Sequence, residues 1–237
     1  MIDLETCDKL TSRFLSVRQD ILEACADTDQ NQADVSLLAV SKKHTIDAIK
    51  HIYSLGQTAF GENYVQEGID KVQALSELNI DWHFIGPIQS NKSKAVAEYF
   101  DWVHTVDREK IASRLNQQRP IDKSPLNVLI QVNISQQDSK SGVNLNEVAT
   151  LAKSISQMPN LCLRGLMCIP AEQETGVLKK EFQQMQHAFK QLKGEYPNID
   201  TLSMGMSGDL TAAIECGSTL VRIGTAIFGQ RQSQIDK

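Results

Sequence analysis

The sequence predicts a (β/α)8 barrel, or TIM barrel, with an extra N-terminal helix. Short apolar segments rich in β-branched residues alternate with longer segments of helical spacing, which is typical of parallel β-α-β units with right-handed crossovers. Eight such apolar segments occur, enough to close a barrel, and 237 residues are close to the roughly 250 of such a domain. An open doubly wound sheet is the alternative, but its usual G-x-G-x-x-G after the first strand is absent.

The strands are expected where the apolar segments lie, at residues 36–41, 58–61, 81–85, 102–106, 127–134, 162–169, 201–204 and 219–223. The helices are expected at residues 4–26, 45–55, 65–78, 91–99, 108–118, 145–157, 179–195 and 209–215. Residues 228–237 are too few for a closing helix, so we expect the helix at 4–26 to cover that part of the barrel. The polar stretch 117–125 has two prolines but is short enough for a loop, and we expect one domain over residues 1–237.

The composition argues against several other classes of protein. Hydrophobic residues make up 41% of the chain, and a net charge of -5 without a basic run disfavours nucleic-acid binding. The five cysteines include no C-x-x-C pair, which disfavours a disulfide framework or a zinc site. The chain begins without the basic start and apolar run of a signal peptide, and no stretch reaches the roughly 18 apolar residues of a membrane span. We therefore expect a cytoplasmic protein.

Two adjacent lysines follow the first expected strand. Because side chains alternate between the faces of a strand, Lys42 shares a face with Leu38 and Val40, while Lys43 points to the other side. One of the two lysines is thus aimed into the C-terminal mouth of the barrel, where barrel enzymes build their active sites. A partly desolvated lysine there would be nucleophilic, although this run alone fits two solvated lysines at a strand end better.

The last two expected strands both end in segments suited to bind phosphate. Residues 203–209 and 221–226 contain glycines, which let backbone N–H groups approach an anion, and they add the hydroxyl groups of Ser207 and Thr225. Ser207 could instead only cap a helix, and Gly224 only turn the chain. In barrels, however, the loops after strands 7 and 8 frequently form a phosphate site, so the two segments together favour phosphate.

A nucleophilic lysine after the first strand, opposite a phosphate site, suggests pyridoxal 5′-phosphate (PLP) held as a Schiff base. A class I aldolase acting on a sugar phosphate would use the same two parts. The aldolase hypothesis is the weaker one because it leaves Arg222 without a role.

Six segments, in order from about residue 35 to residue 229, resemble the pyridoxal phosphate homeostasis protein (YggS/PROSC) family. They are AVSK (39–42), FGENYVQE (60–67), WHFIGPIQSNK (82–92), RGLM (164–167), LSMGMS (202–207) and VRIGTAIFG (221–229). The resemblance implies a barrel similar to the N-terminal domain of alanine racemase. It also implies a PLP-binding protein that acts in intracellular PLP homeostasis, as a carrier or buffer of the cofactor, without an established catalytic reaction.

The resemblance also implies which residues bind the cofactor: Lys42, Asn63, Met206, Ser207, Arg222, Gly224 and Thr225. Lys42 would form the Schiff base, Arg222 would face the pyridine nitrogen, and the residues after the last two strands would hold the phosphate. Asn63 and Met206 are expected near the ring. Lys140 matches a family lysine suspected of a secondary PLP contact, but it could also be an ordinary exposed loop lysine.

Arg222 also bears on catalysis. Arginine cannot accept a hydrogen bond, so a pyridine nitrogen beside it stays unprotonated, which weakens PLP as an electron sink. A racemase also needs a second acid or base, which in alanine racemase is a tyrosine from a further domain of the partner subunit, and only Tyr64 could lie near the mouth here. We therefore expect a monomeric, non-catalytic PLP-binding protein with apo PLP-dependent enzymes as candidate partners. A low-activity amino-acid racemase is the alternative.

Overall fold

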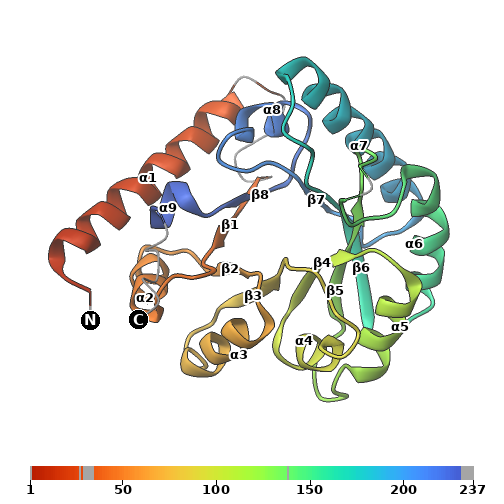
Figure 1. Ribbon diagram of the computed structural model, residues 1–237, viewed down its shortest axis with the longest axis horizontal. Helices are drawn as coiled ribbons and strands as arrows, with labels where there is room; N and C mark the ends of the chain where they lie inside the picture. Colours follow the sequence, from red (N-terminus) through yellow and green to blue (C-terminus); the bar gives the residue numbers. More distant parts are fainter. Residues whose placement is uncertain (1, 27, 29–34, 138, 231–237) are drawn as a thin grey trace.

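The computed structural model describes residues 2–26, 28, 35–137 and 139–230, and it shows a closed barrel (Figure 1). The parallel strands follow one another around the barrel in sequence order, and β8 pairs with β1 to close it. The strands are β1 (Ser36–Val40), β2 (Ala59–Glu62), β3 (Asp81–Phe84), β4 (Trp102–Val106), β5 (Leu126–Val132), β6 (Leu161–Cys168), β7 (Thr201–Ser203) and β8 (Leu220–Ile223). The expected fold class is confirmed, and the strand ends differ little from the expected ones.

The helices lie outside the ring of strands (Figure 1). They are α1 (Leu4–Ala26), α2 (Ile46–Ser54), α3 (Val65–Ala74), α4 (Ser93–Tyr99), α5 (Glu109–Gln118), the 3-10 helix η2 (Leu145–Glu147), α6 (Val148–Ser156), α7 (Thr175–Glu195), α8 (Leu210–Glu215) and α9 (Thr225–Phe228). None of the helices in the described part of the chain is both long and apolar enough to cross a membrane.

Two helix ends differ from the sequence-based expectation by four residues, and one short helix was not expected. Helix α3 stops at Ala74 instead of residue 78, because the chain then turns and the Leu78 N–H donates to Leu75 O at 2.9 Å. Helix α7 begins at Thr175 instead of residue 179. Helix α9 was not expected, because a single turn is too short to show apolar periodicity.

Alternate strand residues face two different environments. One set, which includes Phe60, Trp82 and Ile223, is apolar and belongs to the main core between the strands and the helices. The other set faces the barrel interior and is partly polar, and His104 and Arg222 are buried there. The interior is therefore not filled by apolar side chains alone, and its polar residues lie below the C-terminal mouth.

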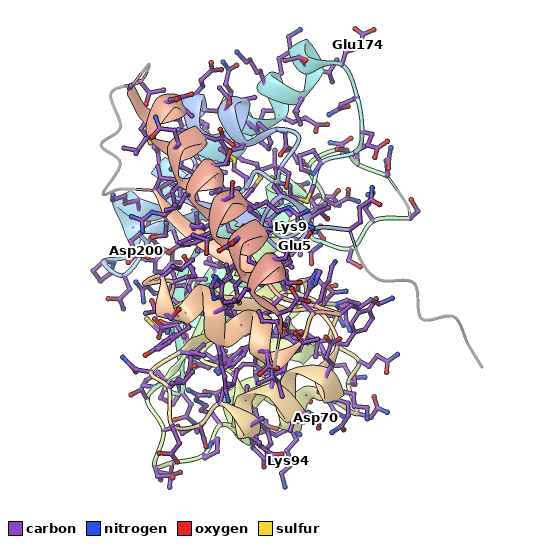
Figure 2. All side chains as sticks on the ribbon, turned by 90° about the vertical axis from the view of Figure 1, so that its left-hand side faces the viewer. Glu5, Lys9, Asp70, Lys94, Glu174 and Asp200 are labelled. Carbon is purple, nitrogen blue, oxygen red and sulfur yellow. The ribbon has the colours of Figure 1, made fainter. Side chains whose placement is uncertain are left out.

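Helix α1 covers the seam at which β8 meets β1. Its buried face carries residues at helical spacing: Leu10, Phe14, Val17, Ile21, Ala24 and Cys25. This face packs against α2, α8 and α9 (Figure 1), and Figure 2 shows α1 lying across the side of the barrel with Glu5 and Lys9 one turn apart. The expectation that the N-terminal helix covers the part of the barrel left open by the short final segment is confirmed.

Candidate functional site

Three neighbouring strands bring most of the expected site residues to one end of the barrel. The strand order is β7-β8-β1, and the register pairs Leu38 of β1 with Arg222 of β8. The Arg222 N–H also donates to Gly205 O, just beyond β7, at 3.0 Å. The segments that follow these strands therefore lie side by side at the C-terminal mouth, and they contain Lys42, Met206, Ser207, Gly224 and Thr225.

The two lysines after β1 lie in different surroundings. Lys42 is half-buried in the turn that directly follows the fully buried Ser41. Lys43 is exposed, has a left-handed backbone with φ of 63°, and places its Nζ atom 5.6 Å from the centroid of the Tyr64 ring. Of the two amines, that of Lys42 belongs to the more enclosed side chain.

The segment after β8 runs very close to β1. A Cβ atom on Gly224 would lie 3.2 Å from Val40 O, so a larger residue would press against the strand that leads to Lys42. Thr225 is exposed and begins α9, while Ser207 is exposed and precedes α8. The first N–H groups of a helix have no intrahelical acceptor, so both segments present donors at the mouth. Hydroxyl and N–H donors in this arrangement can bind an anion.

Asn63 and Met206 flank this arrangement. Asn63 follows β2, the neighbour of β1 on the other side, and is half-buried; its carbonyl oxygen would lie 2.1 Å from a Cβ on Gly86, so the backbones pack tightly there. Met206 is 39% exposed, and its N–H is held by Asp209 Oδ1. Both residues follow strands at their C-terminal ends and so lie at the mouth.

Lys140 is separated from the other expected residues. It lies in the loop that follows β5, a strand that borders none of β7, β8 and β1. Its side chain is exposed, and its backbone N–H donates to Gln137 O at 2.9 Å. Lys140 thus follows a different part of the barrel from the strand that leads to Lys42.

Arg222 points into the barrel and is held there by two neutral groups. Its Nη1 donates to Ser203 Oγ at 2.7 Å, and its Nη2 donates to Cys168 O at 2.9 Å. Among the hydrogen bonds of the described residues, none uses its Nε–H. Burial lowers the pKa of the guanidinium, but an arginine still remains a cation and a donor. Its two partners and its burial place the guanidinium inside the barrel and not on the helix side of β8.

A chain of hydrogen bonds continues from Arg222 across the barrel interior. His104 Nδ1 lies 3.2 Å from Ser203 Oγ, and His104 Nε2 lies 2.9 Å from His83 Nδ1. Burial lowers the pKa of His83 to about 3, and it lowers the pKa of His104 well below 6.5, so both rings are neutral. The sequence analysis did not predict this series of hydrogen bonds. Its only signal in the sequence is a polar residue at alternate positions of two apolar strands.

The direction of each hydrogen bond in this series can be assigned by starting from Arg222. Arg222 can only donate, so the Ser203 hydroxyl accepts from it and can donate its own hydrogen to His104 Nδ1. The Nε2–H of His104 then donates to His83 Nδ1. In the described part of the chain, no group of three or more His, Cys, Asp or Glu side chains could hold a metal ion.

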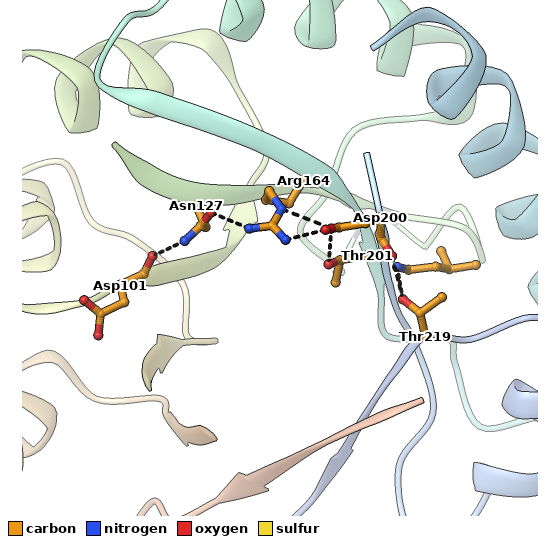
Figure 3. A network of polar contacts seen from close by, with 7 residues as sticks. Asp101, Asn127, Arg164, Asp200, Thr201 and Thr219 are labelled. Carbon is orange, nitrogen blue, oxygen red and sulfur yellow. Dashed lines mark hydrogen bonds and ion pairs between the residues drawn. The ribbon is translucent and has the colours of Figure 1, made fainter. Parts of the chain in front are cut away.

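Arg164, the first residue of the RGLM segment (164–167), lies at the opposite end of the barrel, where the strands begin (Figure 3). The Arg164 guanidinium donates to both carboxylate oxygens of Asp200 and to Asn127 Oδ1 at 2.8 Å. Its centre also lies 4.6 Å from the centroid of the Trp102 ring. The network joins β4, β5, β6 and β7, so Arg164 connects these strands and does not contribute to the mouth.

Comparison with known proteins adds to this geometry. Residues 20–232 match the family model of the alanine racemase N-terminal domain. A relative from Haemophilus influenzae, named pyridoxal phosphate homeostasis protein, is 58% identical over 221 residues, which are 91% of this chain and 93% of the relative. The chain belongs to the pyridoxal phosphate homeostasis protein family. The expected likeness to this family is thereby confirmed.

Solved structures agree with this assignment. The family-related protein PipY of Synechococcus elongatus, solved with PLP bound, is 32% identical with a TM-score of 0.80, and the match covers 93% of this chain and 100% of PipY. An alanine racemase from Clostridium difficile has a TM-score of 0.75 at 14% identity, over 96% of this chain and 58% of the racemase. At that identity the racemase shows the fold alone, and it confirms the expected similarity of the two barrels.

Proposed function

We propose that this chain binds PLP at the barrel mouth and acts in PLP homeostasis, as a carrier or buffer of the cofactor and not as a catalyst. The PLP-bound structure of PipY and the names of the close relatives support the ligand. The observation that carries the proposal for this chain is the position of Arg222, buried below the mouth and held only by neutral partners.

The residues at the mouth fit the three parts of PLP. Lys42 supplies the amine for a Schiff base with the aldehyde. Ser207, Gly224 and Thr225 offer hydroxyl and N–H donors for the phosphate, and a Cβ atom at position 224 would pack tightly, 3.2 Å from Val40 O. The Nε–H of Arg222 would donate to the pyridine nitrogen. Asn63 and Met206 would lie beside the ring.

Bound PLP supplies an electron sink, and Arg222 would weaken it. A carboxylate beside the pyridine nitrogen would favour the protonated ring, but a guanidinium can only donate. Arg222 would thus hold the nitrogen as an unprotonated acceptor. Tyr64, the tyrosine at the mouth, is 44% exposed and therefore is not an enclosed second acid for racemisation. A low-activity racemase is therefore the second candidate.

The remaining features of the proposal follow from the family and the fold. We propose that residues 1–237 form one domain, that the protein is a cytoplasmic monomer, and that apo PLP-dependent enzymes take PLP from the open mouth. Lys140, exposed in the loop after β5, would be a secondary contact for PLP.

The test is reduction of the PLP-loaded protein with borohydride, followed by an absorption spectrum and peptide mapping. The pyridoxyl group is expected on Lys42, and Lys42→Ala should abolish the near-visible absorption of the Schiff base. Lys43→Ala is the matched control and should keep it. A label found mainly on Lys43, or no bound PLP at all, would contradict the proposal. Racemisation of alanine or serine above the Lys42→Ala background would favour the second candidate.

A further inference from the structure

A group of buried charges lies directly behind the turn that carries Lys42, and the proposed cofactor contacts do not use it. Lys71 on α3 is 5% exposed, and Glu62 at the end of β2 is fully buried. Together with Glu67 in the first turn of α3 they form ion pairs, and we call Glu62, Glu67 and Lys71 the charged trio. Charged side chains are seldom buried at all, so the trio calls for a physical reason.

The charged trio holds both residues that flank Lys42. The Lys71 Nζ atom donates to Ser41 O at 2.7 Å, to Glu62 Oε1 at 2.8 Å and to Glu67 Oε1 at 2.7 Å. The Ser41 hydroxyl donates to Glu62 Oε1 at 2.6 Å. The backbone N–H of Lys43 donates to Glu67 Oε1. Ser41 and Lys43 are thereby tied to the neighbouring strand and helix.

These bonds influence the directions of the Lys42 and Lys43 side chains. The φ of 63° at Lys43 lies in the left-handed region, which residues with a side chain rarely adopt. The bond from Lys43 N–H to Glu67 is made in this conformation. The turn sends the Lys43 side chain out over the Tyr64 ring, while Lys42 stays half-buried.

Stability alone does not account for the trio. Glu62 Oε2 has no hydrogen-bond partner, and it is the only such buried side-chain oxygen or nitrogen among the described residues. Burial accordingly raises the pKa of the Glu62 carboxyl, against the attraction of Lys71. Apolar side chains in place of buried ion pairs are often equally stable or more so. Most buried polar groups are hydrogen-bonded, and one that lacks a partner is more typical of a functional position.

We propose that the charged trio is a positioning device for Lys42. By fixing the turn at residues 41–43, it holds the Lys42 amine, and not that of Lys43, within reach of the aldehyde carbon of PLP. The inference rests on the proposed function. In the bond-forming step, the unprotonated Nζ of Lys42 adds to the aldehyde carbon, a C=N bond forms and the aldehyde oxygen leaves as water. The trio acts on this step through the backbone of Ser41 and Lys43.

The test compares variants of the trio with a matched control. Glu67→Ala removes the acceptor for Lys43 N–H and for Lys71, whereas Glu67→Gln keeps an oxygen in place. Lys71→Met keeps the length of the side chain but removes its three hydrogen bonds. The control is Lys94→Met, which breaks the 3.5 Å pair with Glu98 on α4, where the Lys94 side chain is 70% exposed (Figure 2).

Three measurements separate positioning from general damage. They are the rate at which added PLP becomes attached, the division of borohydride-fixed label between Lys42 and Lys43, and the affinity for pyridoxine 5′-phosphate, which has an alcohol instead of the aldehyde. Glu67→Ala and Lys71→Met should attach PLP at least tenfold more slowly or move label to Lys43, yet bind pyridoxine 5′-phosphate within twofold of the unmodified protein. Glu67→Gln should recover most of the rate, and Lys94→Met should not differ from the unmodified protein.

Two outcomes would overturn the positioning role. One is a folded Glu67→Ala protein with an unchanged rate and label on Lys42. The other is a parallel loss of attachment and of pyridoxine 5′-phosphate affinity. If Lys71→Met does not fold, Glu67 decides the matter, because its side chain is 27% exposed and its loss is better tolerated. An unmodified protein that never carries label on Lys42 would refute the proposed function instead.

Discussion

Arg222 offers the sharpest test of the site, because the cost of losing its two structural hydrogen bonds can be weighed against the loss of its proposed cofactor contact. Arg222→Ala removes a buried cation and two hydrogen bonds, to Ser203 Oγ and Cys168 O. Ser203 keeps His104 as a partner, so one buried carbonyl loses its donor. That loss costs about 1–3 kcal/mol of folding free energy, and removal of an unpaired buried charge offsets part of it. We therefore expect the variant to fold.

The expected loss of cofactor affinity has a separate cause. The proposed contact between the Arg222 Nε–H and the pyridine nitrogen would be a charge-assisted hydrogen bond, a type that contributes about 1.5–3 kcal/mol. Since each 1.4 kcal/mol is a factor of ten, Arg222→Ala should weaken PLP binding by about ten- to a hundredfold. Arg222→Glu should in addition favour the protonated ring nitrogen, which the absorption spectrum reports. Lys42 and the phosphate donors should still allow measurable binding.

The assay is titration of PLP into the apo protein, for the original sequence and for each variant. Arg164→Ala is the control, because it also removes a guanidinium from the barrel but at the end far from the mouth (Figure 3). Its PLP affinity should not change. Unchanged affinity and spectrum in a folded Arg222→Ala protein would remove Arg222 from the site, and with it the argument for weak catalysis.

Three further predictions concern the whole protein. Sedimentation should show a monomer at micromolar concentration, and a stable dimer would contradict that prediction. Arg164→Ala should lower the free energy of unfolding by about 1 kcal/mol in urea titrations, since its pair with Asp200 is partly exposed; a loss of PLP affinity without a loss of stability would be the contrary result. Because the folded protein holds the pKa of His83 at about 3, below its usual 6.5, the unfolded chain binds more protons between these values. Stability should therefore fall as the pH drops through this window, by about 2 kcal/mol from His83 between pH 7 and pH 5. His83→Gln should reduce the loss; equal pH dependence in both proteins would show that His83 is not buried and neutral.

Much of the barrel was predictable because its signals are local. The strand at residues 36–41 and the helix at 4–26 each show a regular period within one short segment. Strand alternation was the reason to separate Lys42 from Lys43, but β1 ends at Val40 and the two lysines lie in a turn with a left-handed Lys43, which a strand pattern does not reveal. Helix α9 was not predictable, because four residues cannot show a period.

The interior of the barrel was less accessible from the sequence. The alternation of side chains along a strand puts Arg222 on the opposite face from Val221 and Ile223. The two-residue period is the same whichever face points inward, so it does not show which face that is. The hydrogen-bonded chain from His83 to Ser203 joins residues of β3, β4 and β7, so its geometry depends on how the barrel closes. The charged trio escaped notice because Lys71 and Glu67 read as ordinary exposed helix charges at i, i+4 spacing.

The seam between β8 and β1 has a consequence for how the chain folds. Residues 36–39 pair with 220–223, and α1 packs on α8 and α9, so these contacts join the two ends of the chain. Contacts of such high sequence separation form late, because the entropy of closing the long loop must be overcome first. At about 5–20 residues per second, a ribosome takes roughly 10–40 s to make the intervening segment. During that time the apolar face of α1 lacks α8 and α9, although α2 is already made, and its uncovered part is open to aggregation or to a chaperone. Because Lys42 and Gly224 stand on opposite sides of the seam, the proposed site would be complete only when the last strand has been inserted.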